Sequence, residues 1–275
     1  MNHLMNSPSA PHPIVARDRR QRVQAVTTGI VLLKALARMG GRATLTGLAR
    51  QVEENPAKVH RYLISMMEEG LVEQDPVSLQ YFLGAEAIHI GLVAMRLADP
   101  LRVAEPALLR LRQSLEMTCF LAVMGNKGPT IVRFEEPGLP VTLNVRVGSV
   151  LPLLWSATGR VFLAYLDDSR VEKLAREELE RISPEQRNTL DARDPIGVLK
   201  RDVQAAGMAI VRDTNLQGIS AISLPLFDFS DHLAAVVTVL GATGSFDTSP
   251  SGPVARALQA ESRLISQSLG HAPPN

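Results

Sequence analysis

The segment from residue 44 to residue 84 constrains the fold of this 275-residue chain more than any other. It reads TLTGLARQVEENPAKVHRYLISMMEEGLVEQDPVSLQYFLG. We predict a short helix over 44–52, then a turn at EENPA, then a second helix from Pro56. Asn55 suits the cap of that second helix, and proline suits its first position because it has no N–H to leave unpaired there.

The second helix has one apolar face and is followed by a hairpin. Val59, Leu63 and Met66 recur at helical spacing and predict a buried side, and Gly70 can end the helix in a left-handed conformation. LVEQD and QYFLG, joined by PVS, are typical of two short strands. Two short helices, a tight turn and a hairpin predict a winged helix-turn-helix, in which the second helix enters the DNA major groove.

The charges of the first third agree with DNA binding. Between Arg17 and Met66 the chain has ten Lys and Arg residues against three Asp and Glu residues, whereas the net charge of the whole chain is +1. A basic module in a nearly neutral chain indicates contact with nucleic-acid phosphates. Residues 85–275 carry 19 basic and 21 acidic side chains, so this part shows no such preference.

The composition excludes several classes of protein. Aromatic residues make up only 4% of the chain, which disfavours single-strand binding by base stacking. The one cysteine, Cys119, excludes an internal disulfide and a thiolate-rich zinc site. No apolar run approaches the roughly 18 residues that a membrane-spanning helix needs, and the N-terminus lacks the apolar stretch of a secretory signal. We therefore expect a cytoplasmic protein with no membrane contact.

The winged helix-turn-helix domain is predicted over residues 23–84, with its first helix over 23–39 and a linker helix after it. Residues 1–22 form a disordered basic arm in this prediction, because they combine Pro, Ser and Asn with the run RDRRQR. A helix over 23–39 should turn Val26, Ile30, Leu33 and Ala37 toward the core. A linker helix over 85–99 is apolar on more than one side, so it should pack either against a second copy of the chain or against its own C-terminal domain.

The pattern of residues 100–270 predicts an α+β domain with a mostly antiparallel sheet covered by helices. A short tail follows at 271–275. The predicted helices are 101–116, 156–166, 169–179, 183–192, 195–207 and 250–269. The six predicted strands are 118–126, 129–137, 141–149, and the segments MAIVRD, GISAISLPLFD and HLAAVVTVLGA.

Four segments together resemble the IclR family of bacterial transcriptional regulators, over residues 22–270. They are VHRYLISMMEEGLV, YFLG at the start of a linker helix, VGSVLPLLWSATGRVFLAYL and GMAIVRDTNLQGISAISLPLFD. The resemblance implies a dimerising winged helix-turn-helix, a GAF-like C-terminal domain that binds a small-molecule effector, and a homodimer or homotetramer that binds double-stranded DNA.

The resemblance also implies which residues face DNA. The family usually has a Ser-Thr pair where this chain has Ala57 and Lys58, so its base contacts should differ, while the family's Arg is retained as Arg61. Lys58 can reach guanine or phosphate, and Arg61 can clamp phosphate as well. The residues predicted to contact DNA are Arg22, Thr44, Asn55, Lys58, His60 and Arg61.

The effector site implied by the resemblance lies where a strand leads into the helix SATGRVF. A helix N-terminus carries partial positive charge and unpaired N–H donors, which suit a carboxylate. Because Leu154 and Trp155 are bulky, we expect an aromatic or medium-sized carboxylic acid; the alternative for Trp155, the only tryptophan, is a place in the core. The predicted effector contacts are Leu154, Trp155, Ser156, Ala157, Thr158, Gly159, Asp213, Asn215, Ala221, Ser223 and Thr238.

Nothing in the sequence favours an enzyme. The six histidines show no metal spacing, and there is no GxSxG, P-loop or GxGxxG motif. Cys119 lies among apolar residues and predicts a buried structural thiol. We expect no catalytic residues, no metal and no cofactor. The alternative to a DNA-binding regulator is a winged helix that binds proteins, and a salt titration of binding to random duplex DNA separates the two.

Overall fold

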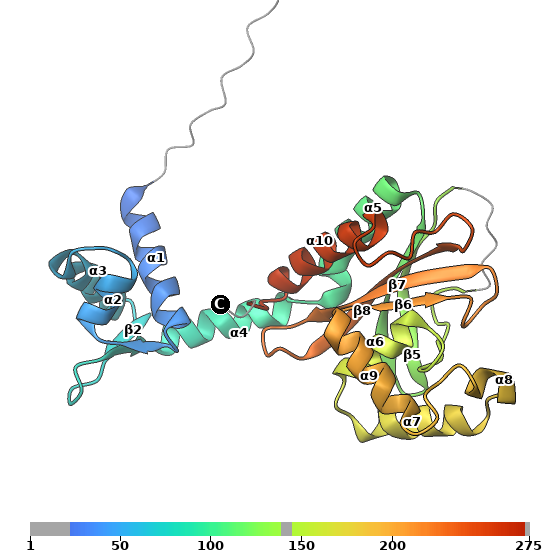
Figure 1. Ribbon diagram of the computed structural model, residues 1–275. Helices are drawn as coiled ribbons and strands as arrows, with labels where there is room; N and C mark the ends of the chain where they lie inside the picture. The colour runs from blue at the N-terminus through green and yellow to red at the C-terminus, as the bar shows by residue number, and fades with distance from the viewer. Residues whose placement is uncertain (1–22, 139–144, 273–275) are drawn as a thin grey trace, which may run out of the picture. The chain divides into compact units, whose positions relative to one another are not determined.

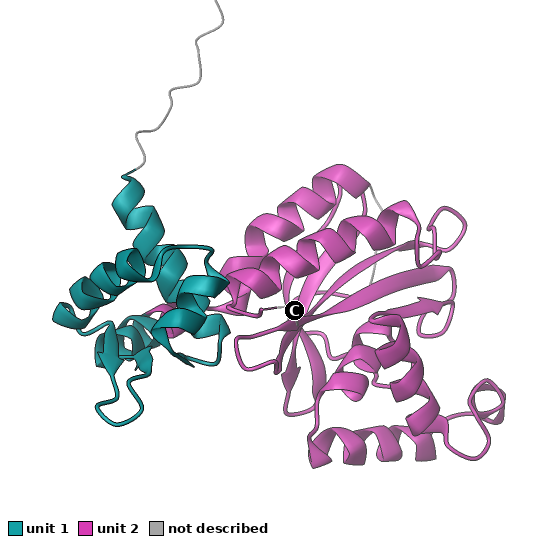
Figure 2. Ribbon diagram, turned by 60° about the vertical axis from the view of Figure 1, so that its left-hand side comes forward, with its two compact units in different colours: residues 1–93 teal, residues 94–275 magenta. Residues whose placement is uncertain are grey.

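The computed structural model of the protein describes residues 23–138 and 145–272 (Figure 1). Its contacts divide the chain into two compact units, one ending at Val93 and the other beginning at Ala94 (Figure 2). The predicted arm at 1–22 and the last three residues of the predicted tail lie outside the described residues.

The N-terminal unit has the predicted winged helix-turn-helix. Its three strands form one antiparallel sheet in the order β1-β3-β2. The elements are α1 (Gln24–Arg38), β1 (Arg42–Ala43), α2 (Leu45–Gln51), α3 (Pro56–Glu68), β2 (Val72–Gln74) and β3 (Tyr81–Leu83) (Figure 1).

Local capping explains where α2 and α3 begin. The Thr44 hydroxyl accepts a hydrogen bond from the Gly47 N–H at 3.1 Å, and the Asn55 side chain accepts one from the Ala57 N–H at 2.8 Å. Each bond satisfies one of the N–H groups that a helix start leaves unpaired. After α3 the chain reverses at Gly70, whose φ of +68° is a conformation that favours glycine.

The face of α1 that turns inward differs from the prediction. Leu32, Ala35 and Leu36 are buried, whereas Val26 is 62% exposed and Ile30 is 47% exposed. Ala37 is also exposed and Leu33 is half-buried. The predicted core face of this helix was therefore wrong. Its sequence, QAVTTGIVLLKALAR, is apolar on two sides, and helical spacing alone does not say which side meets the core.

Helix α4 (Ala85–Leu97) follows the wing, and none of its residues is buried. The division between the units falls inside this helix, between Val93 and Ala94. Its apolar side chains are exposed by large fractions, for example 61% for Ile88 and 48% for Leu92. Within the described chain, the packing predicted for this linker helix is not satisfied by the protein's own residues.

The C-terminal unit contains one antiparallel sheet of five strands in the order β5-β4-β8-β7-β6. Its strands are β4 (Thr118–Gly125), β5 (Gly128–Glu135), β6 (Ala209–Arg212), β7 (Ile219–Phe227) and β8 (Leu233–Ala242). Its helices are α5 (Pro100–Leu115), α6 (Ala157–Tyr165), α7 (Ser169–Glu180), α8 (Pro184–Arg187), α9 (Pro195–Ala206) and α10 (Pro253–Ser268).

Helices cover both faces of this sheet, as Figure 1 shows, so that the predicted α+β architecture is confirmed. Leu108 of α5 and Leu258 of α10 are buried in the core on one face. Phe162 of α6 is buried in the core on the other face, together with Phe120 of β4. The alternation of side chains along the strands supplies both cores, because successive residues point to opposite faces.

The strand predicted over 141–149 does not form in the described part of that segment. Residues 141–144 lie outside the described residues, and residues 146–149 form a turn that is followed by a single bridge between Val150 and Thr130. Gly148, with φ of +89°, allows this turn. The sheet therefore has five strands among the described residues, where the sequence predicted six. The predicted helix over 183–192 is also shorter, since only α8 forms there.

Candidate DNA-binding and effector sites

The outer face of α3 carries Lys58 and Arg61, two of the residues that we predicted to face DNA. Lys58, Arg61, Tyr62 and Ser65 line an open hollow of about 310 Å³ on this helix. The Lys58 ammonium lies 2.7 Å from the carboxylate of Glu54 on the preceding turn, so part of its charge is already neutralised. Arg61 is exposed and forms no ion pair with any residue of 23–138 or 145–272.

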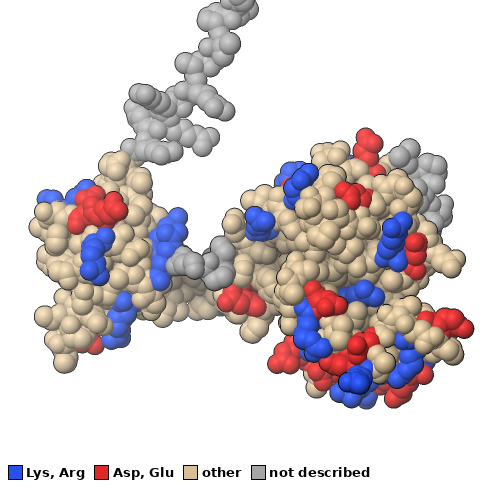
Figure 3. Space-filling model, viewed as in Figure 1, with Lys and Arg blue, Asp and Glu red and all other residues tan. Residues whose placement is uncertain are grey.

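The other predicted DNA-facing residues also hold the unit together. Thr44 and Asn55 cap α2 and α3 and remain exposed. The Nδ1 atom of His60 lies 3.1 Å from the hydroxyl of Tyr81, which joins α3 to the wing strand β3. Arg22 lies outside the described residues. Figure 3 shows Lys and Arg side chains at several places on the N-terminal unit, and a close mixture of both signs of charge on the C-terminal unit.

The wing has a basic residue at its base that the sequence analysis did not single out. The guanidinium of Arg42 lies over the ring of Phe82, 5.1 Å from its centroid, and 3.8 Å from the carboxylate of Asp75. Asp75 accepts hydrogen bonds from the Val77 and Ser78 N–H groups, which lower the pKa of its carboxyl group and hold the wing loop in place.

The predicted effector turn is built around the start of α6. The Ser156 side chain caps this helix, because its oxygen accepts a hydrogen bond from the Gly159 N–H at 2.8 Å and its hydroxyl donates to the Pro152 carbonyl at 2.6 Å. Ser156 is thus the N-cap of α6, a role that is compatible with the effector contact predicted for it. The N–H groups of Ala157 and Thr158 donate no hydrogen bond to any atom in the described ranges, so they stay available at the helix start.

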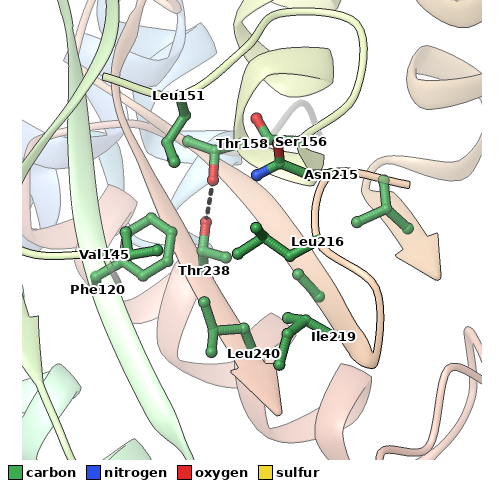
Figure 4. A pocket seen from close by; sticks show the side chains of 12 residues that line it. Phe120, Val145, Leu151, Ser156, Thr158, Asn215, Leu216, Ile219, Thr238 and Leu240 are labelled. Atoms are coloured by element: carbon green, nitrogen blue, oxygen red, sulfur yellow. Dashed lines mark hydrogen bonds between the residues drawn. The ribbon is translucent and has the colours of Figure 1, made fainter. Parts of the chain in front are cut away.

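A cavity of about 40 Å³ lies directly beside this helix start (Figure 4). Five of the predicted effector contacts line it, and apolar residues from β4, β6, β7, β8 and the segments between them complete the wall. The lining residues are Phe120, Val145, Leu151, Ser156, Thr158, Val211, Asn215, Leu216, Ile219, Ala221, Thr238 and Leu240.

Three hydroxyl groups meet under the cavity. The Thr238 hydroxyl lies 2.8 Å from that of Thr158 and 2.7 Å from that of Ser223, and the Thr158 and Ser223 oxygens are 3.4 Å apart. All three side chains are almost fully buried, at 1% exposure or less. Thr158 and Thr238 line the cavity (Figure 4), whereas Ser223, which is hydrogen-bonded to Thr238, does not line it.

The remaining predicted effector contacts do not line the cavity. Leu154 and Trp155 are buried in the core at 0% and 7% exposure, so the core position left open for Trp155 is the observed one. Gly159 lies against the preceding turn, where a Cβ atom would overlap the Pro152 carbonyl oxygen. Ala157 is buried in the same core.

Asp213 shapes a loop beside the cavity and lies outside its lining. Its Oδ1 accepts hydrogen bonds from the Gly218 N–H at 2.7 Å and from the Thr243 hydroxyl at 2.8 Å. Its φ of +55° is unusual for a residue with a side chain. These bonds fix the loop that carries Asn215 and Leu216 to the cavity.

Most of the apolar wall was not predicted from the sequence. Period-two alternation could have pointed to Ile219 from Ala221 and to Leu240 from Thr238, since alternate residues of a strand share a face. No local pattern marks Leu151 or Leu216, which reach the cavity from turns and loops.

A metal-binding cluster is not assembled in the described residues. No three His, Cys, Asp or Glu side chains within 23–138 and 145–272 lie close enough to hold a metal ion. Burial raises the pKa of the Cys119 thiol to about 12, and the thiol donates to the Leu108 carbonyl at 3.2 Å. In the same ranges, no helix has the length and apolar character required to cross a membrane.

Two family models match the chain, and together they cover both units. Residues 25–76 match the IclR helix-turn-helix domain, and residues 94–267 match the model described as the bacterial transcriptional regulator IclR C-terminal domain. This chain belongs to the IclR family. The winged helix-turn-helix and the effector-binding domain of an IclR-family regulator are thus both present, and the resemblance stated from the sequence is confirmed.

Individual IclR-family relatives are similar to this chain over most of their length. The crystal structure of Pseudomonas aeruginosa HmgR shares 38% sequence identity and a TM-score of 0.82, covering 92% of this chain and 100% of that chain. The regulator BhcR of Paracoccus denitrificans is 25% identical, over 80% of this chain and 78% of its own length. The repressor YiaJ of Escherichia coli is 23% identical, over 92% of this chain and 90% of its own length.

These matches decide between the function classes left open by the sequence. The matched domains and the named relatives are DNA-binding transcriptional regulators and not enzymes. This chain is accordingly a DNA-binding transcriptional regulator of the IclR family, with a helix-turn-helix and a separate effector-binding domain. The protein-interaction alternative for its winged helix is set aside.

Proposed function

We propose that this regulator binds a carboxylic acid at the N-terminus of α6. The observation that carries the proposal is the cavity beside that helix start, which is lined by Thr158, whose N–H group has no acceptor in the described chain. A helix N-terminus favours an anion through its partial positive charge and its free donors. The hydroxyls of Ser156, Thr158 and Thr238 provide further polar partners for a carboxylate.

The walls of the cavity favour an acid with an apolar body, of aromatic or medium size. Apolar side chains, among them Phe120, Leu151 and Ile219, make up most of the lining, and apolar walls with few polar groups are typical of small-molecule sites. A volume of about 40 Å³ admits several waters, since one water needs roughly 10–15 Å³. We propose that Leu216, 41% exposed on the adjacent loop, moves outward to admit the acid.

The DNA-binding part of the proposal rests on α3. Arg61 and Lys58 lie on its outer face, and a recognition helix of this kind reads base edges in the major groove. We propose Arg61 as the main contact, because Lys58 is paired with Glu54. Thr44, Asn55 and His60 are proposed as neighbouring contacts, and Arg22 as a contact from the arm.

We propose a homodimer or homotetramer as the active assembly. The exposed apolar side chains of α4 favour burial against a second copy, since isolated helices rarely expose so many. Two winged helices related by two-fold symmetry would read two half-sites. The acid then shifts an equilibrium between conformations, and its effect equals the difference between its affinities for them.

Selection of bound sequences from random duplex DNA, with and without a panel of carboxylic acids, tests the proposal. We expect an enriched sequence with two-fold symmetry, and a change in its recovery with benzoate-sized acids. Ligand-dependent fluorescence of Trp155, the only tryptophan, gives a direct binding signal. A response to pyruvate-sized acids with none to any aromatic acid would contradict the proposed acid class.

A further inference from the structure

The turn at residues 152–155 fixes where α6 begins. Gly159, in the first turn of the helix, lies so close to this turn that a Cβ atom there would overlap the Pro152 carbonyl oxygen and the Cα of Leu153. Two backbones packed at this distance cannot shift independently. Any movement of the turn therefore moves the helix start and the free N–H groups of Ala157 and Thr158.

A carboxylate on α7 holds this turn from outside. The two oxygens of Glu178 accept hydrogen bonds from the Leu153 N–H at 2.7 Å and from the Leu154 N–H at 3.2 Å. Leu153 and Leu154 are buried at 2% and 0% exposure, so these N–H groups have little access to water. Glu178 thus satisfies two donors that would otherwise be buried without a partner.

Two other side chains hold the carbonyl groups of the same turn. The Nε of Arg160, on α6, donates to the Leu154 carbonyl at 2.8 Å. The hydroxyl of Thr214, on the loop that carries Leu216 to the cavity, donates to the Trp155 carbonyl at 2.6 Å. The turn is therefore fastened to α6, to α7 and to the loop beside the cavity.

The environment of Glu178 is costly for a charged group. Burial raises the pKa of its carboxyl group, although the two backbone hydrogen bonds oppose this shift. None of the ion pairs within 23–138 and 145–272 includes Glu178, so no cation there offsets the free-energy cost of burying its carboxylate. Its contacts are directed at the turn, which indicates that the turn's placement is what this side chain secures.

We propose that Glu178 is a positioning residue of the effector site: it holds the turn at residues 152–155 and so sets the placement of the α6 N-terminus. Its hydrogen bonds go to Leu153 and Leu154, which do not line the cavity, so it acts on the site through the turn. The inference rests on the effector site proposed above, and it connects α7, a helix outside that site, to effector affinity.

The variant Glu178→Gln tests this in the full-length protein, with Glu177→Gln as the matched control. Glu177 is the preceding residue of α7 and forms only an outer ion pair with Lys173, at 3.9 Å. In Glu178→Gln we expect one of the two amides, Leu153 or Leu154, to exchange about tenfold faster, because the carboxamide keeps one acceptor oxygen and presents an NH2 group, which cannot accept, to the other amide. We also expect altered Trp155 emission and about tenfold weaker benzoate binding. Glu177→Gln should match the wild type in all three measurements.

Two outcomes would overturn the inference: unchanged exchange at Leu153 and Leu154, or faster exchange with unchanged affinity for benzoate. If the wild type itself does not bind benzoate, the proposed acid class fails, and the positioning role is decided by exchange and Trp155 emission alone. Should Glu178→Gln not fold, Thr214→Val removes the bond to the Trp155 carbonyl from the opposite side. The same loss of protection and change in emission are then expected, and wild-type behaviour of both would count against the inference.

Discussion

The side-chain oxygen of Thr158 lies 2.8 Å from that of Thr238, although the two residues are 80 positions apart in the chain. This contact joins the first turn of α6 to the middle of β8 and places two hydroxyl groups at the base of the cavity. The helix start is thereby tied to the sheet by a polar contact in an otherwise apolar core. Ser223, hydrogen-bonded to Thr238, extends the tie to β7.

Replacing Thr238 with valine should weaken this junction. The substitution conserves shape but leaves the buried hydroxyls of Thr158 and Ser223 short of a partner, which costs about 1–3 kcal/mol. We expect that decrease in the free energy of unfolding in urea, together with weaker acid binding. Thr130→Val is the control, since the Thr130 hydroxyl bonds only the Gly128 carbonyl, outside the cavity. Equal stability of the two variants would contradict a structural role for the buried hydroxyls.

Arg61→Ala should reduce the affinity for the selected DNA. If Arg61 reads a base, the loss is about 1–3 kcal/mol and specificity relaxes at one position. If it holds a phosphate, the loss is uniform across sequences and the salt dependence of binding becomes shallower. Lys58→Ala should cost less, because Lys58 is already paired with Glu54. Filter binding or fluorescence anisotropy at several salt concentrations measures all three effects.

Arg256→Ala provides the control for lost charge. Arg256 is exposed on α10 in the C-terminal unit and forms no ion pair in the described ranges, so its removal changes the net charge equally. We expect wild-type DNA affinity from this variant. Equal losses in Arg61→Ala and Arg256→Ala would mean that overall charge, and not the surface of α3, determines binding.

Short-range sequence signals correctly predicted where the recognition helix α3 begins and where it ends. Asn55 and Pro56 mark the start of α3, and Gly70 follows its end in the left-handed conformation, as expected from capping rules. These signals act over a few residues, so they can be read without knowing the rest of the fold. The strands β7 and β8 were predictable for the same reason, from short apolar runs between turns.

Signals that depend on distant parts of the chain were not readable. The prediction of the buried face of α1 was wrong because Val26 and Leu32 lie on two apolar sides of one helix. Only the packing of the whole unit determines which of the two sides is buried. The cavity shows the same limit. Ser156 and Thr238 were predicted through the family resemblance, whereas Leu216 reaches the wall through the path of a loop that no local pattern determines. Leu154 and Trp155, adjacent to Ser156 in sequence, instead point into the core.

The thiol of Cys119 should be inert in the folded protein. Its pKa, raised by burial from 9.0 to about 12, leaves almost no thiolate at neutral pH, and the thiolate is the reactive form. We expect no labelling by a thiol reagent at pH 8 without denaturant, and complete labelling of one thiol in urea. Because the thiol has a higher pKa in the folded than in the unfolded chain, ionisation of Cys119 destabilises the folded state. Its contribution to the free energy of unfolding is therefore fully present below pH 9.0 and is lost as the pH rises toward about 12. Rapid labelling of the native protein would contradict the buried position.

The exposed apolar side chains of α4 lead to a prediction about dimer formation and its effect on DNA binding. Ile88 and Leu92 are four residues apart and therefore lie on one side of the helix, with exposures of 61% and 48%. Leu92→Glu should place a charge in the proposed contact with a second copy and shift the mass in solution toward the monomer. Because two half-sites are read together, affinity for a two-fold symmetric DNA site should fall with the loss of the dimer. Ala94→Glu is the control, since it adds the same charge to α4 away from this stripe. Light scattering after size-exclusion chromatography measures the mass, and identical masses for wild type and Leu92→Glu would place the contact between copies elsewhere on the chain.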